Sequence, residues 1–147
     1  MEVVRNKGPE DNFLHKVREL ATKRNIVLIF DECTSGFRQT FGGLHKLYGV
    51  EPDMAMFGKA LGNGYAITAT IGRREIMEAA QSTFISSTFW TERIGPTAAL
   101  KTLEVMQREK SWETITHTGL KIREGWQQLA DKHGLKIDHW GLPALTG

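Results

Sequence analysis

Hydrophobic residues follow a helical period near the start of the chain and then form an unbroken run. Between residues 11 and 21 they share one face of a helix, which an Asp or Asn at its start can cap. Those apolar positions are Phe13, Leu14, Val17, Leu20 and Ala21. The run at residues 26–30 is continuous and rich in β-branched and aromatic residues, which predicts a strand buried on both faces.

The same two patterns recur along the rest of the chain. Short apolar runs predict strands at residues 54–57, 66–72, 84–85 and 135–139. Helical stripes predict helices at residues 73–80, from Pro96 through Met106, and at 111–133, where Gly134 can end the last helix. Strands and helices in this order are typical of an α/β fold, with a mostly parallel sheet flanked by helices.

Length and composition fit one folded domain. The chain has 147 residues, of which 40% are hydrophobic and 24% charged, so it lies outside the range of disordered proteins. Lys and Arg number 19 against 17 Asp and Glu, a net charge of +2 with no basic stripe, so we expect no nucleic-acid partner. Cys33 is the single cysteine and the His spacing does not suit metal ligation, so we expect neither a disulfide nor a metal site.

Targeting signals add little to this description. No apolar run reaches the length of a membrane span, and the first residues lack the apolar stretch of a signal peptide. We therefore expect a cytoplasmic protein with no membrane partner.

Two ionisable residues follow the two clearest strand patterns. Asp31 comes directly after the run at 26–30, and Lys59 follows the run at 54–57. In an open α/β sheet, ligands bind beyond the carboxyl ends of the strands, so we expect both side chains to face one site. An amine and a carboxylate so placed suit pyridoxal phosphate, which needs a Lys for a Schiff base and an acid to keep its ring nitrogen protonated.

A purely structural interpretation of the same two residues is open at this point. An Asp after a strand commonly caps a turn or a helix, and a Lys in that position is commonly solvated. The chain would then be an unrelated α/β domain. The wider sequence distinguishes the two interpretations.

A set of motifs over about fifty positions supports the cofactor interpretation. In chain order they are IFDECTSGFR at 29–38, GG at 42–43, YGV at 48–50, PD at 52–53, GKALGNG at 58–64 and GRREIM at 72–77. In order and spacing they resemble the class III, fold-type I pyridoxal-phosphate enzymes, which are mostly aminotransferases. The GFR and GRREIM motifs are most similar to those of the glutamate-1-semialdehyde 2,1-aminomutases.

The resemblance implies a role for each matched residue. Lys59 would form the Schiff base with the cofactor and move a proton between the substrate and the cofactor. Asp31 would pair with the ring nitrogen. Cys33 stands where the family usually has Val or Ile against the face of the ring.

The segment SSTFWT at 86–91 resembles a family segment whose threonine binds the cofactor phosphate of the neighbouring subunit. Thr88 aligns with that threonine, which implies a homodimer with shared active sites. The family's usual Gly-Asn-Pro is replaced here by Thr91-Glu92-Arg93. A loop that only caps the next helix is therefore an alternative.

Members of the family are considerably longer, so the resemblance implies a fragment. Residues 1–134 would be part of the cofactor-binding large domain with a connecting helix, and residues 135–147 the beginning of the C-terminal small domain. The implied activity is amino-group transfer or 2,1-aminomutation on a small-molecule amino donor or acceptor. The alternative is a catalytically silent segment of this fold with a binding or dimerisation role.

Overall fold

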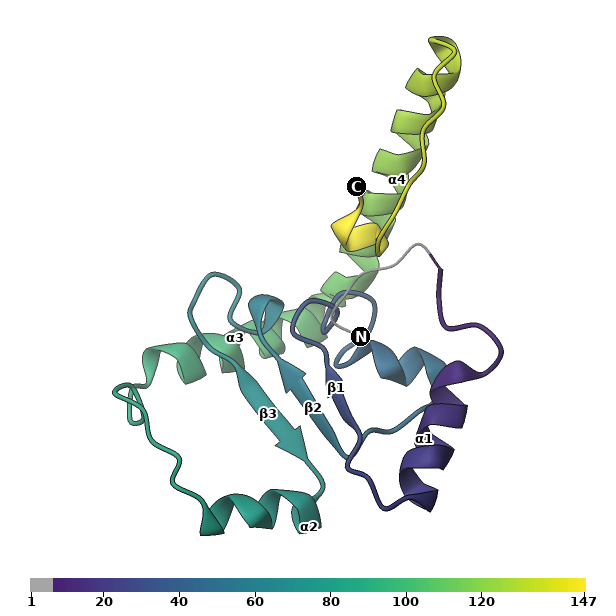
Figure 1. Cartoon of the computed structure of the whole chain (residues 1–147). Coiled ribbons are helices and arrows are strands. Elements are labelled where there is room, and N and C mark those ends of the chain that lie inside the picture. Colours follow the sequence, from purple (N-terminus) through teal and green to yellow (C-terminus); the bar gives the residue numbers. More distant parts are fainter. Residues whose placement is uncertain (1–6) are drawn as a thin grey trace.

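The computed structural model describes residues 7–147 as a small mixed sheet with helices around it (Figure 1). The strands are β1 (Ile29–Asp31), β2 (Met54–Phe57) and β3 (Ala69–Gly72). The α-helices are α1 (Phe13–Lys23), α2 (Arg74–Met77), α3 (Ile94–Glu109) and α4 (Ser111–Lys132). Short 3-10 helices are η1 (Leu44–Tyr48), η2 (Lys59–Leu61), η3 (Glu78–Ser82) and η4 (Pro143–Leu145). The expected α/β class is confirmed.

The sheet has the order β1-β2-β3. β1 and β2 are parallel, with Ile29 opposite Met54 and Asp31 opposite Met56. β3 runs antiparallel to β2, so Met54 lies opposite Gly72. Because β1 and β2 run the same way, the residues that follow them emerge at the same edge of the sheet.

β1 is shorter and more exposed than its apolar run predicts. It begins at Ile29, because Pro52 has no N–H to extend the ladder and the Asp53 carboxylate binds the backbone N–H of Leu28 at 2.7 Å. Phe30 is buried, but 49% of Ile29 is exposed. The expectation of a strand buried on both faces is therefore wrong.

Two other strand predictions are wrong. Residues 84 and 85 lie in an extended, exposed segment with no strand beside them in the described part of the chain, and Phe84 is 95% exposed. Residues 135–139 also form no strand. Elsewhere, β3 starts three residues later than predicted, and the helix expected at 73–80 is divided into α2 and η3.

The C-terminal segment returns along α4 instead of entering a sheet (Figure 1). Gly134 ends the helix in a left-handed conformation, as predicted, with φ 65°. Arg123 of α4 then donates hydrogen bonds to the carbonyls of Trp140 and Gly141. The Pro143 carbonyl lies so close to Gly119 that a Cβ there would come within 1.8 Å of it.

α1 forms where the periodic pattern predicts it, although its start differs from the expectation. Asn12 occupies the N-cap position in a left-handed conformation, and its side chain makes no capping hydrogen bond. Phe13 and Leu20 are more than half exposed. Arg18 links this helix to the sheet, because its guanidinium donates to Asp53 Oδ2 at 2.8 Å.

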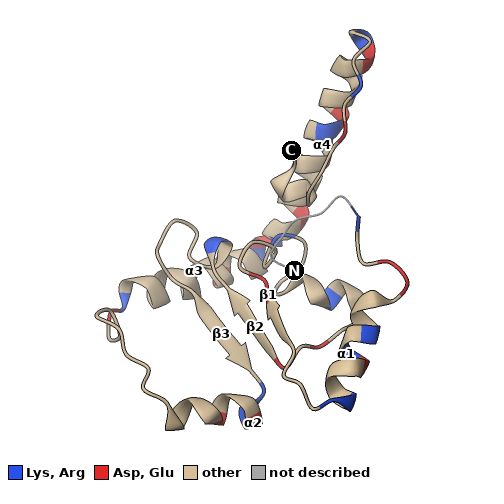
Figure 2. Ribbon diagram, in the orientation of Figure 1, with Lys and Arg blue, Asp and Glu red and all other residues tan. Residues whose placement is uncertain are grey.

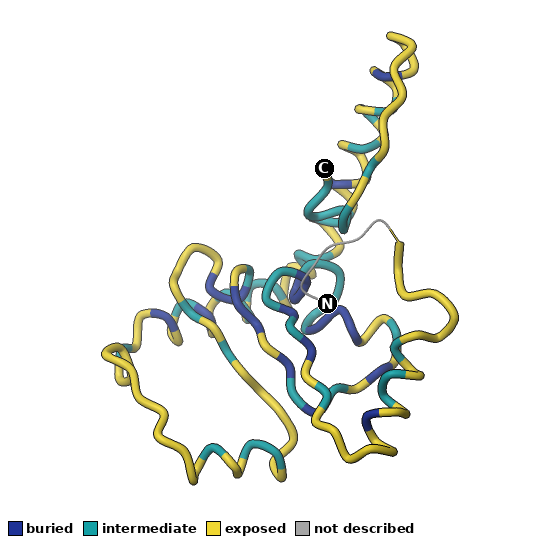
Figure 3. Tube along the Cα trace, in the orientation of Figure 1, coloured by how far each residue is buried: buried dark blue, intermediate teal, exposed yellow. Residues whose placement is uncertain are grey.

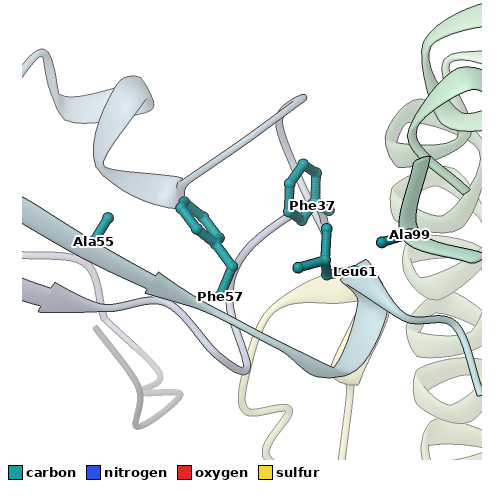
Figure 4. Close-up of a cluster of buried hydrophobic side chains, with 5 residues drawn as sticks. All are labelled: Phe37, Ala55, Phe57, Leu61 and Ala99. Atoms are coloured by element: carbon teal, nitrogen blue, oxygen red, sulfur yellow. The ribbon is translucent and has the colours of Figure 1, made fainter. Parts of the chain in front are cut away.

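The buried residues concentrate around β2 and the loop after β1, whereas α4 is exposed along most of its length (Figure 3). A cluster of buried apolar side chains joins that loop, β2, η2 and α3 (Figure 4): Phe37, Ala55, Phe57, Leu61 and Ala99. The rings of Phe37 and Phe57 are 5.4 Å apart. Since Leu61 belongs to this cluster, the helical turn that begins at Lys59 is anchored in the core.

Acidic and basic side chains are interspersed along α1 and α4 (Figure 2). Among the described helices, none has both the length and the apolar character needed to cross a membrane. Nowhere in the described part of the chain do three or more metal-ligating side chains lie together.

Candidate active site

Asp31 and Lys59 stand at the sheet edge that the sequence indicates. Asp31 is the last residue of β1, opposite Met56 in the register. Lys59 is the first residue of η2, two positions after β2 ends. The backbone N–H of Glu32 donates to the Met56 carbonyl at 2.9 Å, which ties the chain that follows Asp31 to the strand that leads to Lys59.

The Asp31 carboxylate is held at the start of the loop that follows it. Its Oδ1 accepts a hydrogen bond from the backbone N–H of Cys33 at 3.0 Å, an Asx-type contact across two residues. The side chain is half-buried. This contact limits the rotation of the carboxylate and leaves it at the end of the strand.

Cys33 lies against the peptide that precedes Lys59. A Cβ on Gly58 would come within 2.6 Å of Cys33 Sγ and 3.3 Å of Thr68 Cγ2. Position 58 therefore requires glycine for a close approach rather than for an unusual backbone angle. Cys33 takes part in no disulfide and is half-buried.

Thr34 is a site residue that the sequence did not single out. Lys59 Nζ donates a hydrogen bond to Thr34 Oγ1, which joins the loop after β1 to the turn after β2. The Arg38 guanidinium donates to the Thr34 carbonyl at 3.3 Å. The available sequence signal was its position in the DECTSG motif, directly after Cys33.

Glu32 is fully buried and holds the loop after β1 in place. Its carboxylate accepts hydrogen bonds from Ser35 Oγ at 2.5 Å and from the backbone N–H groups of Leu44 and His45 at 2.8 and 2.9 Å. His45 Nδ1 lies 2.9 Å from the same carboxylate. These donors reach the buried carboxylate only while the loop keeps this conformation.

Asp53 is a second buried carboxylate that the sequence interpretation missed. It accepts hydrogen bonds from the backbone N–H of Leu28 and from Arg18, and Arg73 Nη1 lies 3.4 Å from its other oxygen. The Leu28 N–H, followed by Arg18 and Arg73, holds the pKa of the Asp53 carboxyl below its ordinary value, against the opposing effect of burial. Asp53 thereby joins α1, β1 and the residue after β3.

A cavity of about 1140 Å³ opens on the α3 side of Lys59. Its walls come from residues 37–38, from Lys59 and the turn that follows, from α3 and from the start of α4. Asp31, Cys33 and Thr88 are not among the residues that line it. Lys59 therefore borders two regions. It contacts the loop after β1 through Thr34, and it also lines this cavity.

Thr88 lies apart from the other predicted site residues. It belongs to an exposed segment between η3 and α3, in which the Ser87 side chain and carbonyl bind the next backbone N–H groups. Its expected contact is with a neighbouring subunit, so the role of Thr88 stays a prediction.

Comparisons with known proteins agree on one family. The family model for class-III aminotransferases matches residues 7–139. A 3-aminobutyryl-CoA aminotransferase from Cloacimonas acidaminovorans is 40% identical over 92% of this chain and 33% of its own. A glutamate-1-semialdehyde 2,1-aminomutase from Natranaerobius thermophilus is 36% identical over 88% of this chain and 31% of its own.

The fold comparison gives the same result. The FumI protein of a Sphingopyxis species, solved in its PLP internal aldimine form, superposes with a TM-score of 0.85 and 28% identity. That match covers 89% of this chain and 32% of the other. The chain thus spans about a third of the length of the relatives that it matches. With a family model that covers nearly all of its residues, the chain belongs to the class-III aminotransferase family.

Proposed function

We propose that this sequence forms part of a cytoplasmic, pyridoxal-phosphate-dependent enzyme that moves an amino group on small-molecule substrates, with Lys59 as its cofactor-binding lysine. The observation that carries the proposal is the parallel register of β1 and β2, which brings Asp31 and the turn of Lys59 to one sheet edge. Ligands of open α/β sheets bind at such an edge.

The residues at this edge fit the cofactor chemically. The ring nitrogen of pyridoxal phosphate calls for a carboxylate, which Asp31 supplies from a fixed position at the end of β1. Its aldehyde calls for an amine, which Lys59 supplies. Glycine at position 58 allows the Cys33 thiol to lie beside the backbone that carries this amine, a suitable neighbour for an aromatic ring face.

Pyridoxal phosphate, when bound, supplies an aldehyde that takes up amines and a ring that accepts the electron pair left on a deprotonated carbon. Lys59 would hold the cofactor through Nζ and, once a substrate amine replaces it, would hold and move the proton at the substrate carbon. Thr34 Oγ1, which accepts a hydrogen bond from Nζ, would keep the amine near this position. Asp31 would keep the ring nitrogen protonated.

Aminotransfer and 2,1-aminomutation share these steps at Lys59. Of the two relatives described above, one is named as an aminotransferase and the other as a 2,1-aminomutase.

We include a homodimer in the proposal, in which Thr88 contacts the cofactor phosphate of the other subunit. The exposure of Thr88 and of its neighbours Phe89 and Trp90, 75% and 65% exposed, supports that arrangement.

Absorption spectroscopy tests the proposal. Addition of pyridoxal phosphate should produce the visible band of a lysine-bound cofactor, and Lys59→Ala should abolish it. Lys46→Ala is the matched control, because Lys46 is also exposed and donates only to the Phe41 carbonyl among the described residues. A band that survives Lys59→Ala would mean that the cofactor binds to other amines, and no band in the parent chain would favour the alternative of a silent segment.

A further inference from the structure

The charged residues that line the cavity beside Lys59 are all positive. Four cationic residues line it: Arg38, Lys59, Arg93 and Lys101. None of the described residues in its lining is an Asp or a Glu. A concave surface with cations alone on its walls attracts anions, because its low-dielectric sides concentrate the field.

Two of these cations, one just before α3 and one within it, follow the same helical face. Arg93 immediately precedes the helix, Thr97 follows four residues later and Lys101 four residues after that, and all three line the cavity. That spacing repeats along one helical face, and it separates Arg93 from Lys101 by roughly 12 Å along the axis. The stripe offers a guanidinium, a hydroxyl and an ammonium, which are all donors to oxyanions.

Arg93 belongs to the segment that departs from the family's usual Gly-Asn-Pro. In this chain the preceding residue, Glu92, accepts hydrogen bonds from the backbone N–H groups of Ile94 and Gly95, the latter at 3.1 Å. Glu92 is therefore engaged at the start of α3, where a carboxylate is favourable. Of the residues that replace the family's Gly-Asn-Pro, Arg93 is therefore the one that adds a charge to the cavity wall.

The surroundings of Arg38 and Lys101 leave both side chains able to bind an anion. Arg38 is half-buried, and its burial lowers the pKa of the guanidinium, an effect that a nearby anion would offset. Lys101 pairs with Glu104 at 2.7 Å, but both side chains are largely exposed, so this pair is weak. A ligand oxyanion can compete with Glu104 for Lys101.

We propose that this cavity binds a negatively charged tail of the amine substrate, of the phosphate or pyrophosphate class, and that Arg93 and Lys101 determine that specificity. The proposal rests on Lys59 as the cofactor-binding lysine, since the amine of the same substrate would have to reach the cofactor carbon that Nζ holds and replace Nζ there. The tail would lie along α3, with its far charges beside Lys101 and the reacting amine beside Lys59.

Inorganic pyrophosphate is the probe, and its binding to the purified chain is measured by titration calorimetry without cofactor. Arg93→Gln and Lys101→Gln should each raise the Kd about threefold to fivefold, as expected for one partly solvated charge pair. The double variant should raise it about tenfold or more. Lys121→Gln, an exposed cation on α4 outside the cavity, is the control and should leave the Kd unchanged.

Variants that bind pyrophosphate like the parent chain, or an equal loss in Lys121→Gln, would overturn the proposal. Circular dichroism of each variant confirms that its fold is intact. If pyrophosphate also blocked cofactor attachment to Lys59, and the two α3 variants weakened that attachment to the same extent, the cations would bind the cofactor's phosphate and the substrate assignment would be wrong. Absent labelling of Lys59 with intact pyrophosphate binding would reject the proposed function and support the anion site alone.

Discussion

Two loops of this protein carry residues that the sequence assigns to the site, and they are held in opposite ways. The loop after β1, residues 32–45, is fastened at both ends by the buried Glu32 carboxylate. The segment between η3 and α3, which carries Thr88, is exposed throughout residues 81–91 and makes mainly local hydrogen bonds. Residues 32–45 contain three Ser and Thr and residues 81–91 contain six, so the number of hydroxyl groups does not explain why the first loop is the one held in place. The difference comes from one buried carboxylate that accepts hydrogen bonds from several donors.

The largest effect is expected from a substitution that removes the Glu32 carboxylate. Glu32→Ala leaves the Ser35 hydroxyl, two backbone N–H groups and His45 without their partner, so it should lower the free energy of unfolding by about 3 kcal/mol or more. Urea denaturation followed by circular dichroism measures it. Glu19→Ala on the exposed surface of α1 is the control. Equal stability of the two variants would mean that the loop after β1 is held by other contacts.

The next effect concerns the other buried carboxylate. Asp53→Asn loses the charge that Arg18 and Arg73 face, and should cost about 2 kcal/mol at neutral pH. Since folding lowers the pKa of Asp53, its contribution is complete above the ordinary value of 3.8 and disappears as the pH falls through the lower folded value. The stability difference between parent and Asp53→Asn should therefore shrink in strong acid. A difference that stays constant with pH would contradict this origin.

A smaller effect tests how closely the anchored loop approaches Lys59. Gly58→Ala places a methyl group within 2.6 Å of Cys33 Sγ and should cost about 1.5 kcal/mol. In a Cys33→Ala background the same change should cost less, because the clashing sulfur is gone. Denaturation midpoints of the four chains give the coupling. Additive costs would show that Cys33 and Gly58 are not in contact.

The smallest effect compares one hydroxyl from each loop. Ser35→Ala removes a donor to buried Glu32 and should cost about 1 kcal/mol. Thr88→Ala should change the stability by less than about 0.5 kcal/mol, as is usual for an exposed position. Thermal melts of the two variants measure both. A larger loss at Thr88 than at Ser35 would reverse the comparison of the two loops.

Local sequence pattern was sufficient where an element depends on its own residues. α4 and its Gly134 end were predictable because the helical period and the left-handed glycine lie within one continuous segment. β1 was predicted too long, because its start is decided by Pro52 and Asp53, which lie far along the chain. The two-residue run at 84–85 was misread, since a strand needs a partner that short apolar runs do not specify.

The same division applies to the site. Asp31 and Lys59 could be placed from sequence, because strand ends follow from where apolar runs stop. The contacts of Glu32 with Leu44 and His45, and of Lys59 with Thr34, could not, because they depend on a loop conformation set by residues distant in sequence. The spacing of Arg93 and Lys101 lies within one segment of the sequence, but that Arg38 lines the same cavity follows only from the three-dimensional structure.

Reduction with borohydride after incubation with pyridoxal phosphate, followed by peptide mapping, shows directly which lysine holds the cofactor. We expect one stoichiometric phosphopyridoxyl group on the peptide that contains Lys59, with little on the chain's other lysines. Label spread over many lysines, or concentrated on any lysine other than Lys59, would contradict it.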